Sequence, residues 1–409
     1  MSNVEPNAEK KAKVLLGEIV DRHYKEAWEA KNNGEKVGWC ASNFPQEIFE
    51  TLGVKVVYPE NQAAAISAKG GGERLCEHAE NMGYSNDICS YARISLAFSD
   101  VKDAPEMPMP QPDFVLCCNN ICNCMIKWYE NLAKSLDIPM ILVDIPFNND
   151  YDAEQDRVDY VKGQFDYAIS QLEEITGKKW DEKKFEEVME ISQRTGRAWL
   201  DAIGMCSANP SPFNGFDIFN HMAVAVCARG KIESAIAFEK LLEEFKENVR
   251  EGKSTFRGEE KFRILFEGIA CWPHLRHTFT TLKEAGVNVT GTVYADAFGY
   301  IYENTDELMK AYCRTPNAIS YERSLDMRLK AIKENECDGA LIHINRSCKQ
   351  WTGTMYQLER DIREKAGIPT AIFDGDQADP RNFSPAQYDT RVQGLIEVMT
   401  ANKEAKAND

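Results

Sequence analysis

Cysteine is the residue type in this sequence whose number could support unusual chemistry. The chain has 13 cysteines in 409 residues, and a thiolate is both a nucleophile and a ligand for soft metals. Most of the cysteines fit a buried, unreactive position, because free cysteine is among the most buried residue types. We expect this of Cys206, Cys227, Cys313 and Cys337.

Two cysteines occupy corresponding positions in an internal repeat. Cys118 precedes an Ile-Pro pair by 20 residues and an aspartate by 26 residues, and Cys348 precedes a second pair and a second aspartate at the same spacings. Each unit reads as a strand, a cysteine-bearing loop, a helix, Ile-Pro, a strand and Asp. The repeat predicts two domains of related architecture, and it singles out these two thiols as a pair.

A zinc ion or an iron–sulfur cluster can be bound by thiolates that come from distant positions in the chain. The densest group, residues 117–124, lacks the C-x-x-C pair of a zinc finger and the C-x-x-C-x-x-C run of a bacterial ferredoxin. If Cys122 and Cys124 lie in a helix, they point about 200° apart, so both cannot face one site. Cys118, expected in the loop before that helix, is then the better ligand. Cys89 is a third candidate.

The elements that must position these thiols follow from the apolar pattern. Short apolar runs that alternate with helical stretches indicate βαβ units and a parallel sheet. We expect strands at 53–58, 113–117, 139–144, 262–267, 287–293, 339–344 and 369–373, and helices at 7–32, 121–136 and 386–402. Residues 151–205 and 215–250 read as three or four amphipathic helices without a good strand.

The predicted fold is therefore α/β, with two doubly wound, Rossmann-like parallel-sheet domains. They are expected at residues 1–150, including the N-terminal helix, and at residues 256–409, with a helical segment at 151–255 between them. In open α/β sheets, ligands gather outside the carboxyl ends of the strands. Both repeat cysteines follow strands, so two domains that face each other across a cleft would present both thiols to one object.

Composition excludes several classes of function. The net charge of −17 argues against a nucleic-acid surface, which is usually basic. No segment reaches the ~18–20 apolar residues of a membrane span, and the start of the chain lacks the apolar region of a signal peptide. We expect a cytoplasmic protein with reduced cysteines. The sequence contains no P-loop, so any use of ATP belongs to a partner.

Six motifs together resemble the 2-hydroxyacyl-CoA dehydratase family, and in particular its longer, active-site α subunit. The likeness runs from about residue 35 to 400, and the family is more distantly related to benzoyl-CoA reductases. The motifs are Tyr58-Pro-Glu-Asn-Gln62, Asp87-Ile-Cys-Ser-Tyr-Ala-Arg93, Leu116-Cys-Cys-Asn-Asn-Ile-Cys122, Ser254-Thr-Phe-Arg-Gly-Glu-Glu260, Arg346-Ser-Cys-Lys349 and Asp374-Gly-Asp-Gln-Ala-Asp-Pro-Arg381.

The resemblance implies a [4Fe–4S] cluster on three cysteines, which match Cys89, Cys118 and Cys348, with Cys117 as an alternative to Cys118. It implies elimination of water from an (R)-2-hydroxyacyl-CoA to give the 2-enoyl-CoA. In this family the fourth iron binds the thioester carbonyl, and one recycled electron makes a ketyl radical that expels the α-hydroxide. It also raises Glu60 as a proton carrier or a contact to the substrate hydroxyl. Ser42 is expected to be a hydrogen-bond partner at the same site.

The resemblance further implies two protein partners: a smaller homologous β subunit with its own cluster, and an ATP-dependent iron–sulfur activator. Two other functions are weighed beside this one. One is a cluster-bearing reductase or electron-transfer component of the benzoyl-CoA reductase type, and the other is a zinc-stabilised scaffold without catalysis. The acyl group stays open among lactoyl, 2-hydroxyisocaproyl and phenyllactyl thioesters, since no dedicated cation for a second carboxylate stands out.

Overall fold

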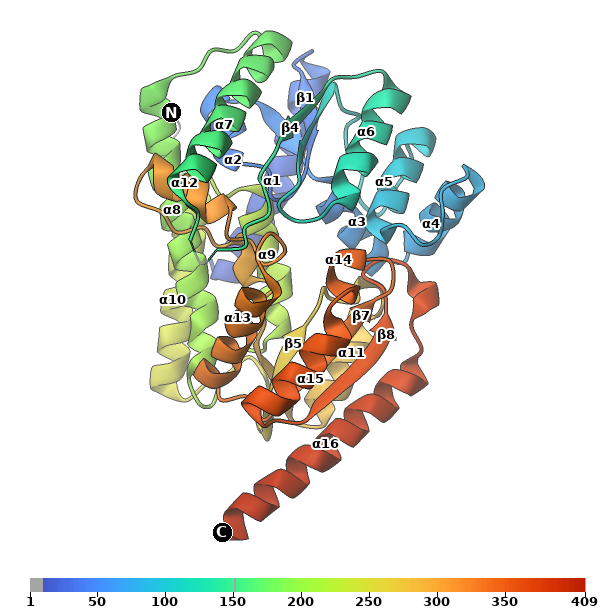
Figure 1. Ribbon diagram of the computed structural model, residues 1–409, viewed down its shortest axis with the longest axis vertical. Coiled ribbons are helices and arrows are strands. Elements are labelled where there is room, and N and C mark those ends of the chain that lie inside the picture. Colours follow the sequence, from blue (N-terminus) through green and yellow to red (C-terminus); the bar gives the residue numbers. More distant parts are fainter. Residues whose placement is uncertain (1–9, 151, 409) are drawn as a thin grey trace.

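The computed structural model describes residues 10–150 and 152–408. It contains two four-stranded sheets in which all neighbouring strands are parallel, one above the other in Figure 1. The strand orders are β2-β1-β3-β4 and β6-β5-β7-β8, so the two sheets share one topology. The α/β prediction with two parallel sheets is confirmed.

The strands of the first sheet are β1 (Val37–Cys40), β2 (Lys55–Val57), β3 (Phe114–Cys118) and β4 (Met140–Val143). Those of the second are β5 (Phe262–Glu267), β6 (Val287–Gly291), β7 (Gly339–Asn345) and β8 (Thr370–Gly375). The central strands β1, β3, β5 and β7 are buried along their whole length. Such continuous burial is expected of parallel strands that are covered on both faces.

The helices of the first half are α1 (Ala12–Asn32), α2 (Gln46–Leu52), α3 (Pro59–Ala68), α4 (Gly72–Asn81), α5 (Ser90–Val101) and α6 (Cys124–Leu136). The middle of the chain forms α7 (Gln155–Thr176), α8 (Glu182–Gly204), α9 (Phe216–Cys227) and α10 (Ile232–Glu251). The last third adds α11 (Leu275–Glu284), α12 (Thr305–Tyr312), α13 (Tyr321–Glu334), α14 (Lys349–Thr352), α15 (Met355–Ala366) and α16 (Pro385–Asn408).

Residues 152–255 form four long helices and no strand, in agreement with the pattern of that segment. They stand along one side of both sheets in Figure 1. Helix α1 packs on α9 and α10, and α12, from the last third of the chain, packs on α7. The helical segment therefore holds the two sheets together, because it contacts elements from both ends of the chain.

The register of the two sheets corrects the alignment of the internal repeat. The backbone N–H of Val115 donates to the carbonyl of Pro139 at 2.9 Å, and that of Ala340 donates to Pro369 at 3.0 Å. Val115 therefore corresponds to Ala340. By this match, Cys118 corresponds to His343, which lies inside strand β7. The spacing along the sequence misled because the connection from this strand to the next is longer in the second half.

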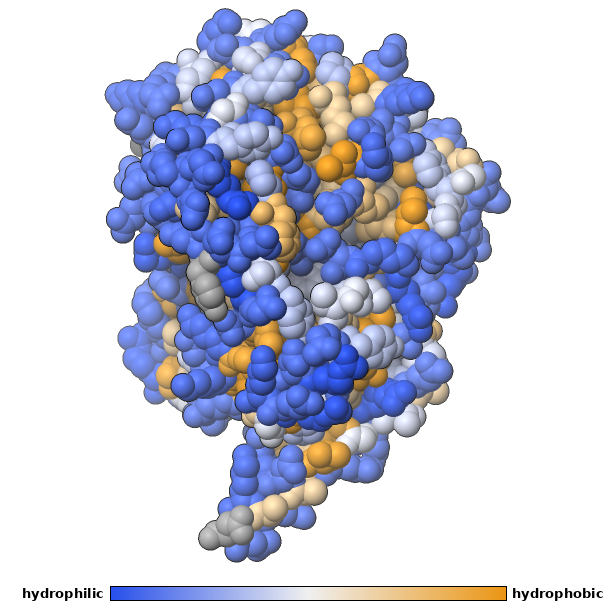
Figure 2. Space-filling model, viewed as in Figure 1, coloured by the Kyte–Doolittle hydropathy of each residue, from blue (hydrophilic) through white to orange (hydrophobic). Residues whose placement is uncertain are grey.

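Figure 2 shows a largely hydrophilic face, in keeping with the net charge of −17, with hydrophobic residues gathered over the upper half between α6 and α7. Across residues 10–150 and 152–408, every helix is too short or too polar to cross a membrane.

Candidate functional site

A cavity lies where the carboxyl ends of the two sheets face each other. Loops that follow seven of the eight strands, all but β4, contribute to its wall. This is the cleft that the topology of two facing open sheets predicts. Its lining residues include Ser42, Asn43, Glu60, Cys89, Tyr91, Ile121, Cys122, Cys124, Met125, Trp128, Ile269, Tyr294, Phe298, Thr315, Asn317, Cys348, Gln350, Trp351 and Gln377.

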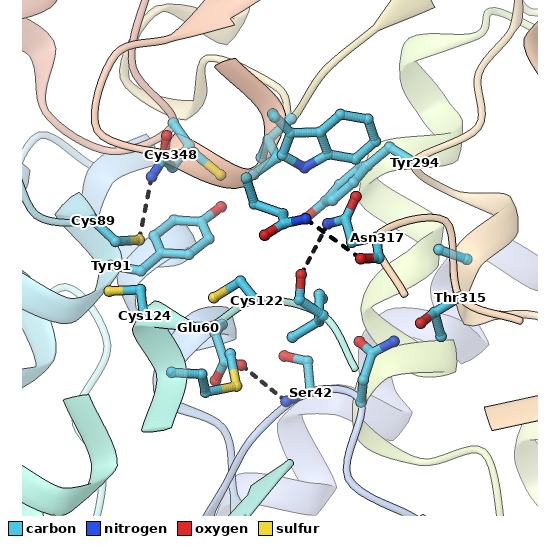
Figure 3. Close-up of a pocket in the computed structure, with 18 of the residues that line it drawn as sticks. Ser42, Glu60, Cys89, Tyr91, Cys122, Cys124, Tyr294, Thr315, Asn317 and Cys348 are labelled. Atoms are coloured by element: carbon cyan, nitrogen blue, oxygen red, sulfur yellow. Dashed lines mark hydrogen bonds between the residues drawn. The ribbon is translucent and has the colours of Figure 1, made fainter. Parts of the chain in front are cut away.

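Four thiols line this cavity, from both halves of the chain: Cys89, Cys122, Cys124 and Cys348. Cys89 directly precedes α5, and Cys348 directly precedes α14. In Figure 3 the thiols of Cys89 and Cys122 point toward the space between them, near the Cys348 thiol, whereas the Cys124 sulfur is turned outward in this view. The structure thus brings together two of the three cysteines singled out in the sequence.

The expected third cysteine, Cys118, is not among the residues that line the cavity. Cys117 and Cys118 are the last two residues of β3, and both side chains are fully buried in the hydrophobic core. The sequence pattern placed Cys118 in a loop, but the strand continues through it. Helix α6 begins only at Cys124, so Cys122 lies in the loop, and the helical-spacing argument against it does not apply.

The loop that carries Cys122 is held by the second half of the chain. The side-chain amide of Asn120 donates a hydrogen bond to the carbonyl of Tyr312, the last residue of α12, at 3.1 Å. The backbone carbonyl of Asn120 accepts a hydrogen bond from the Thr315 hydroxyl at 2.7 Å. Asn317 donates to the carbonyl of Ile121 at 3.0 Å. These contacts fix the backbone immediately before Cys122, so its thiol is positioned by both halves together.

Burial keeps the cavity thiols in their neutral form. It raises the pKa of Cys348 to about 12, and burial together with neighbouring thiols raises the pKa of Cys89 and of Cys122 well above the usual range. Two adjacent thiolates repel each other, so ionisation of this group requires a compensating cation. A metal centre supplies such a charge, and a coordinating thiol is then deprotonated. The donor set therefore fits a thiolate-bound metal group.

Glu60 is the carboxyl group of the cavity, and it enters from the first turn of α3. Its Oε1 accepts the backbone N–H of Ser42 at 2.9 Å, and its Oε2 accepts the Tyr129 hydroxyl at 3.2 Å. Burial raises the pKa of Glu60, and these hydrogen bonds offset only part of that effect. Glu60 and Ser42 thus lie together, and the carboxyl is suited to hold a proton nearer to neutral pH.

A buried ion pair lies next to the cavity and is linked to one of its lining residues. Arg229 and Glu47 are both fully buried, with Nε and Oε1 3.7 Å apart. The guanidinium also donates to the Tyr312 hydroxyl at 2.6 Å and lies over the Tyr300 ring, 4.3 Å from its centroid. Tyr300 in turn accepts a hydrogen bond from cavity residue Asn43 at 2.9 Å. The network ties α2 to the helical segment and to the end of α12.

A second cavity meets the first at Ser42, Glu60, Tyr91, Tyr294 and Phe298. The wall of this second cavity is formed by alanines of α3, by residues of α9 and by Trp272. Ala68, the last residue of α3, is exposed. Glu60 therefore lines both cavities, which the sequence alone did not indicate.

Sequence reasoning left Cys122 as a poor candidate and gave no role to Tyr91, Tyr294 or Gln377, although Tyr91 and Gln377 lie inside two of the motifs. The register of the repeat carries the missing signal for Cys122. With Val115 matched to Ala340, the counterpart of Cys348 falls between Cys122 and Cys124.

Comparison with known proteins identifies the family of the chain. Residues 41–399 match the family described as 2-hydroxyglutaryl-CoA dehydratase, D-component. The chain is 66% identical over 398 residues to the (R)-phenyllactyl-CoA dehydratase alpha subunit of Clostridium sporogenes, covering 97% of this chain and 98% of that protein. It is 49% identical over 397 residues to the (R)-2-hydroxyisocaproyl-CoA dehydratase alpha subunit of Clostridioides difficile, with 96% and 97% covered.

The (R)-2-hydroxyglutaryl-CoA dehydratase subunit alpha of Acidaminococcus fermentans is 46% identical to the chain over 464 residues, with 96% of this chain and 97% of that protein covered. The chain belongs to the 2-hydroxyglutaryl-CoA dehydratase D-component family.

Proposed function

We propose that this chain is the active-site subunit of a hydro-lyase that removes water from an (R)-2-hydroxyacyl-CoA to give the 2-enoyl-CoA. The relatives at 46–66% identity are named as alpha subunits of such dehydratases. The observation that carries the proposal is the cavity itself, where thiols from both halves of the chain meet a carboxyl group of raised pKa. A zinc-stabilised scaffold has no need of that carboxyl.

Cys89, Cys122 and Cys348 would hold a [4Fe–4S] cluster, with Cys122 in place of the Cys118 expected from the sequence. Within the described residues, no three Cys, His, Asp or Glu side chains are grouped to hold a single metal ion. Thiols spread around one cavity instead suit a cluster in which each cysteine binds a different iron. When bound, the cluster supplies one electron and a Lewis-acidic iron to the thioester carbonyl.

Glu60 carries the proton in this proposal. Its carboxyl group is buried at the wall of the cavity, and its raised pKa allows it to give a proton to the departing hydroxyl group and to take one from the β-carbon. Ser42 and Tyr129 hold both carboxyl oxygens, so the proton-bearing group has a fixed orientation. Water would leave as product, and a bound cluster would take back the electron.

The acyl group is proposed to carry an aromatic ring. Bulky aromatic side chains line the cavity: Trp128, Tyr294, Phe298 and Trp351. Rings pack favourably on one another in offset or edge-on arrangements. The relative with 66% identity is named for an (R)-phenyllactyl thioester, which has such a ring.

Two partners complete the proposal. The relatives are named as alpha subunits, which implies a second subunit. We propose a smaller homologous β subunit with its own cluster. Because the sequence has no P-loop, the low-potential electron would come from a separate iron–sulfur activator that hydrolyses ATP.

The test is a single activation. The chain is purified anaerobically with its β subunit, activated once with reductant, activator and ATP, and freed of ATP. Cinnamoyl-CoA formed from (R)-phenyllactyl-CoA is then followed. Many turnovers after ATP removal are expected, since the electron is recycled. A strict one-to-one ratio of product to ATP would instead indicate a reductase that consumes its electrons.

A further inference from the structure

Gln377 places a hydrogen-bond donor on one of the cavity thiols. Its side-chain Nε2 lies 3.4 Å from Cys89 Sγ and 3.1 Å from the Ser347 hydroxyl. Gln377 follows β8 in the second sheet, whereas Cys89 precedes α5 in the first half of the chain. The contact therefore crosses between the two halves, as the dashed line to Cys89 shows in Figure 3.

The amide of Gln377 is held in place by a buried hydrogen-bonded group, here called the clasp, of Ser90, Ser347 and Asp376. The Ser347 hydroxyl, one residue before Cys348, accepts hydrogen bonds from Gln377 and from the backbone N–H of Ser90 at 3.0 Å. Asp376 accepts the Ser90 hydroxyl at 2.5 Å and the backbone N–H of Ser347 at 3.0 Å. The clasp thus joins the residues next to two cavity cysteines and sets the direction of the amide.

The orientation of this amide follows from its surroundings. With Nε2 toward Cys89, the amide donates to both the sulfur and the Ser347 oxygen. A cluster-bound Cys89 sulfur carries no proton and can only accept, so the flipped amide would set its carbonyl oxygen against that sulfur and lose the donated bond. Gln377 is fully buried, so water cannot compensate for that loss.

We propose that Gln377 is a positioning and tuning residue, which donates an N–H···S hydrogen bond to Cys89 and so makes the bound cluster easier to reduce. A reduced cluster carries one more negative charge, part of which resides on its cysteine sulfurs, and a donor aimed at a sulfur stabilises that charge. Hydrogen bonds to the sulfurs are among the factors that set cluster potentials. The inference rests on the proposed function, because it requires a cluster on Cys89.

The experiment is a redox titration of the anaerobic complex, followed by electron paramagnetic resonance of the reduced cluster. Gln377→Leu removes the donor, and Gln377→Glu keeps the size but replaces the amide with an acid. Both midpoint potentials are expected to become more negative. For Gln377→Leu the ratio of reduced to oxidised cluster at a fixed potential should fall about tenfold, which is about 59 mV for one electron.

Gln62→Leu is the matched control. Gln62 is equally buried and donates a single amide hydrogen bond, to the carbonyl of Met107 at 2.9 Å, but it lines neither cavity. Its loss tests whether any buried glutamine shifts the potential by loosening the fold. The midpoint of this variant should equal that of the wild type.

If Gln377→Leu loses its iron, its potential cannot be measured, so a second measurement is made on the wild-type protein. In wild-type protein labelled with ¹⁵N in glutamine side chains, pulsed resonance should detect one nitrogen coupled to the reduced cluster, and Gln377→Glu should abolish that coupling. An unchanged potential in an iron-replete Gln377 variant, or the absence of the coupling, would overturn the inference while leaving the dehydratase intact. A wild-type complex without any cluster would overturn both.

Discussion

Replacement of Glu60 by Gln tests the proton carrier directly. The variant keeps the shape of the side chain, and its amide oxygen can still accept the backbone N–H of Ser42, which now lies 2.9 Å from the carboxyl. The fold and the thiols should therefore be unaffected, and only the movable proton is lost. Positioned acid–base groups contribute about 10²–10⁴-fold to rate, so kcat should fall by about that factor, with full iron content.

The same substitution should change stability with a defined sign. Burial raises the pKa of Glu60 in the folded state, so the folded chain binds this proton more tightly than the unfolded chain. Stability is then lost as pH rises through and above the unfolded pKa of about 4.3. Because Gln cannot ionise, Glu60→Gln should be more stable than wild type near neutral pH, and this gain should vanish below about pH 4.

The assay combines initial rates of enoyl-CoA formation, after one activation, with urea unfolding at acidic and neutral pH. Glu60→Asp is the companion variant, since it keeps an acid but withdraws it from the cavity. A Glu60→Gln rate within threefold of wild type, in protein that retains its iron, would refute the role of Glu60 as proton carrier. A variant less stable than wild type at neutral pH would refute the sign of the pKa shift.

Two further predictions concern the support of the site. Arg229→Met leaves Glu47 as an unpaired buried charge, so the free energy of unfolding should fall by about 3–5 kcal/mol in urea titrations; a loss below about 1 kcal/mol would show that the network is not needed. Asn317→Ala removes the hydrogen bond to Ile121, so about 1 kcal/mol should be lost. It should also speed removal of iron by a chelator, and an unchanged rate would mean that this contact does not hold the Cys122 loop.

The α/β class was predictable because the strands of both sheets are short apolar runs that alternate with helices. The facing cleft followed from the repeat, and Glu60 and Ser42 lie where a strand-end site requires. Helix α2 and strand β1 escaped prediction, since both are short and their residues are buried on all sides. Periodicity gives no signal in a segment without an exposed face.

The choice of cysteine shows what spacing cannot resolve. The Ile-Pro pairs lie at the same distance from Cys118 and Cys348, and that spacing would match Val115 to Asn345. The strand register matches Val115 to Ala340 instead. Strand register depends on hydrogen bonds between distant segments, which a count along the chain does not contain. The contact of Gln377 with Cys89 is likewise formed only by folding. The two motifs that contain these residues give no sign that they touch.

The central claim is that a cluster occupies the cavity on Cys89, Cys122 and Cys348. Iron content and the resonance spectrum of the reduced protein, compared between Cys122→Ser and Cys118→Ser, test it most directly. Cys122→Ser should lose iron and activity, whereas Cys118→Ser should retain the wild-type iron content and spectrum. Full iron in Cys122→Ser together with loss of iron in Cys118→Ser would contradict the proposed site.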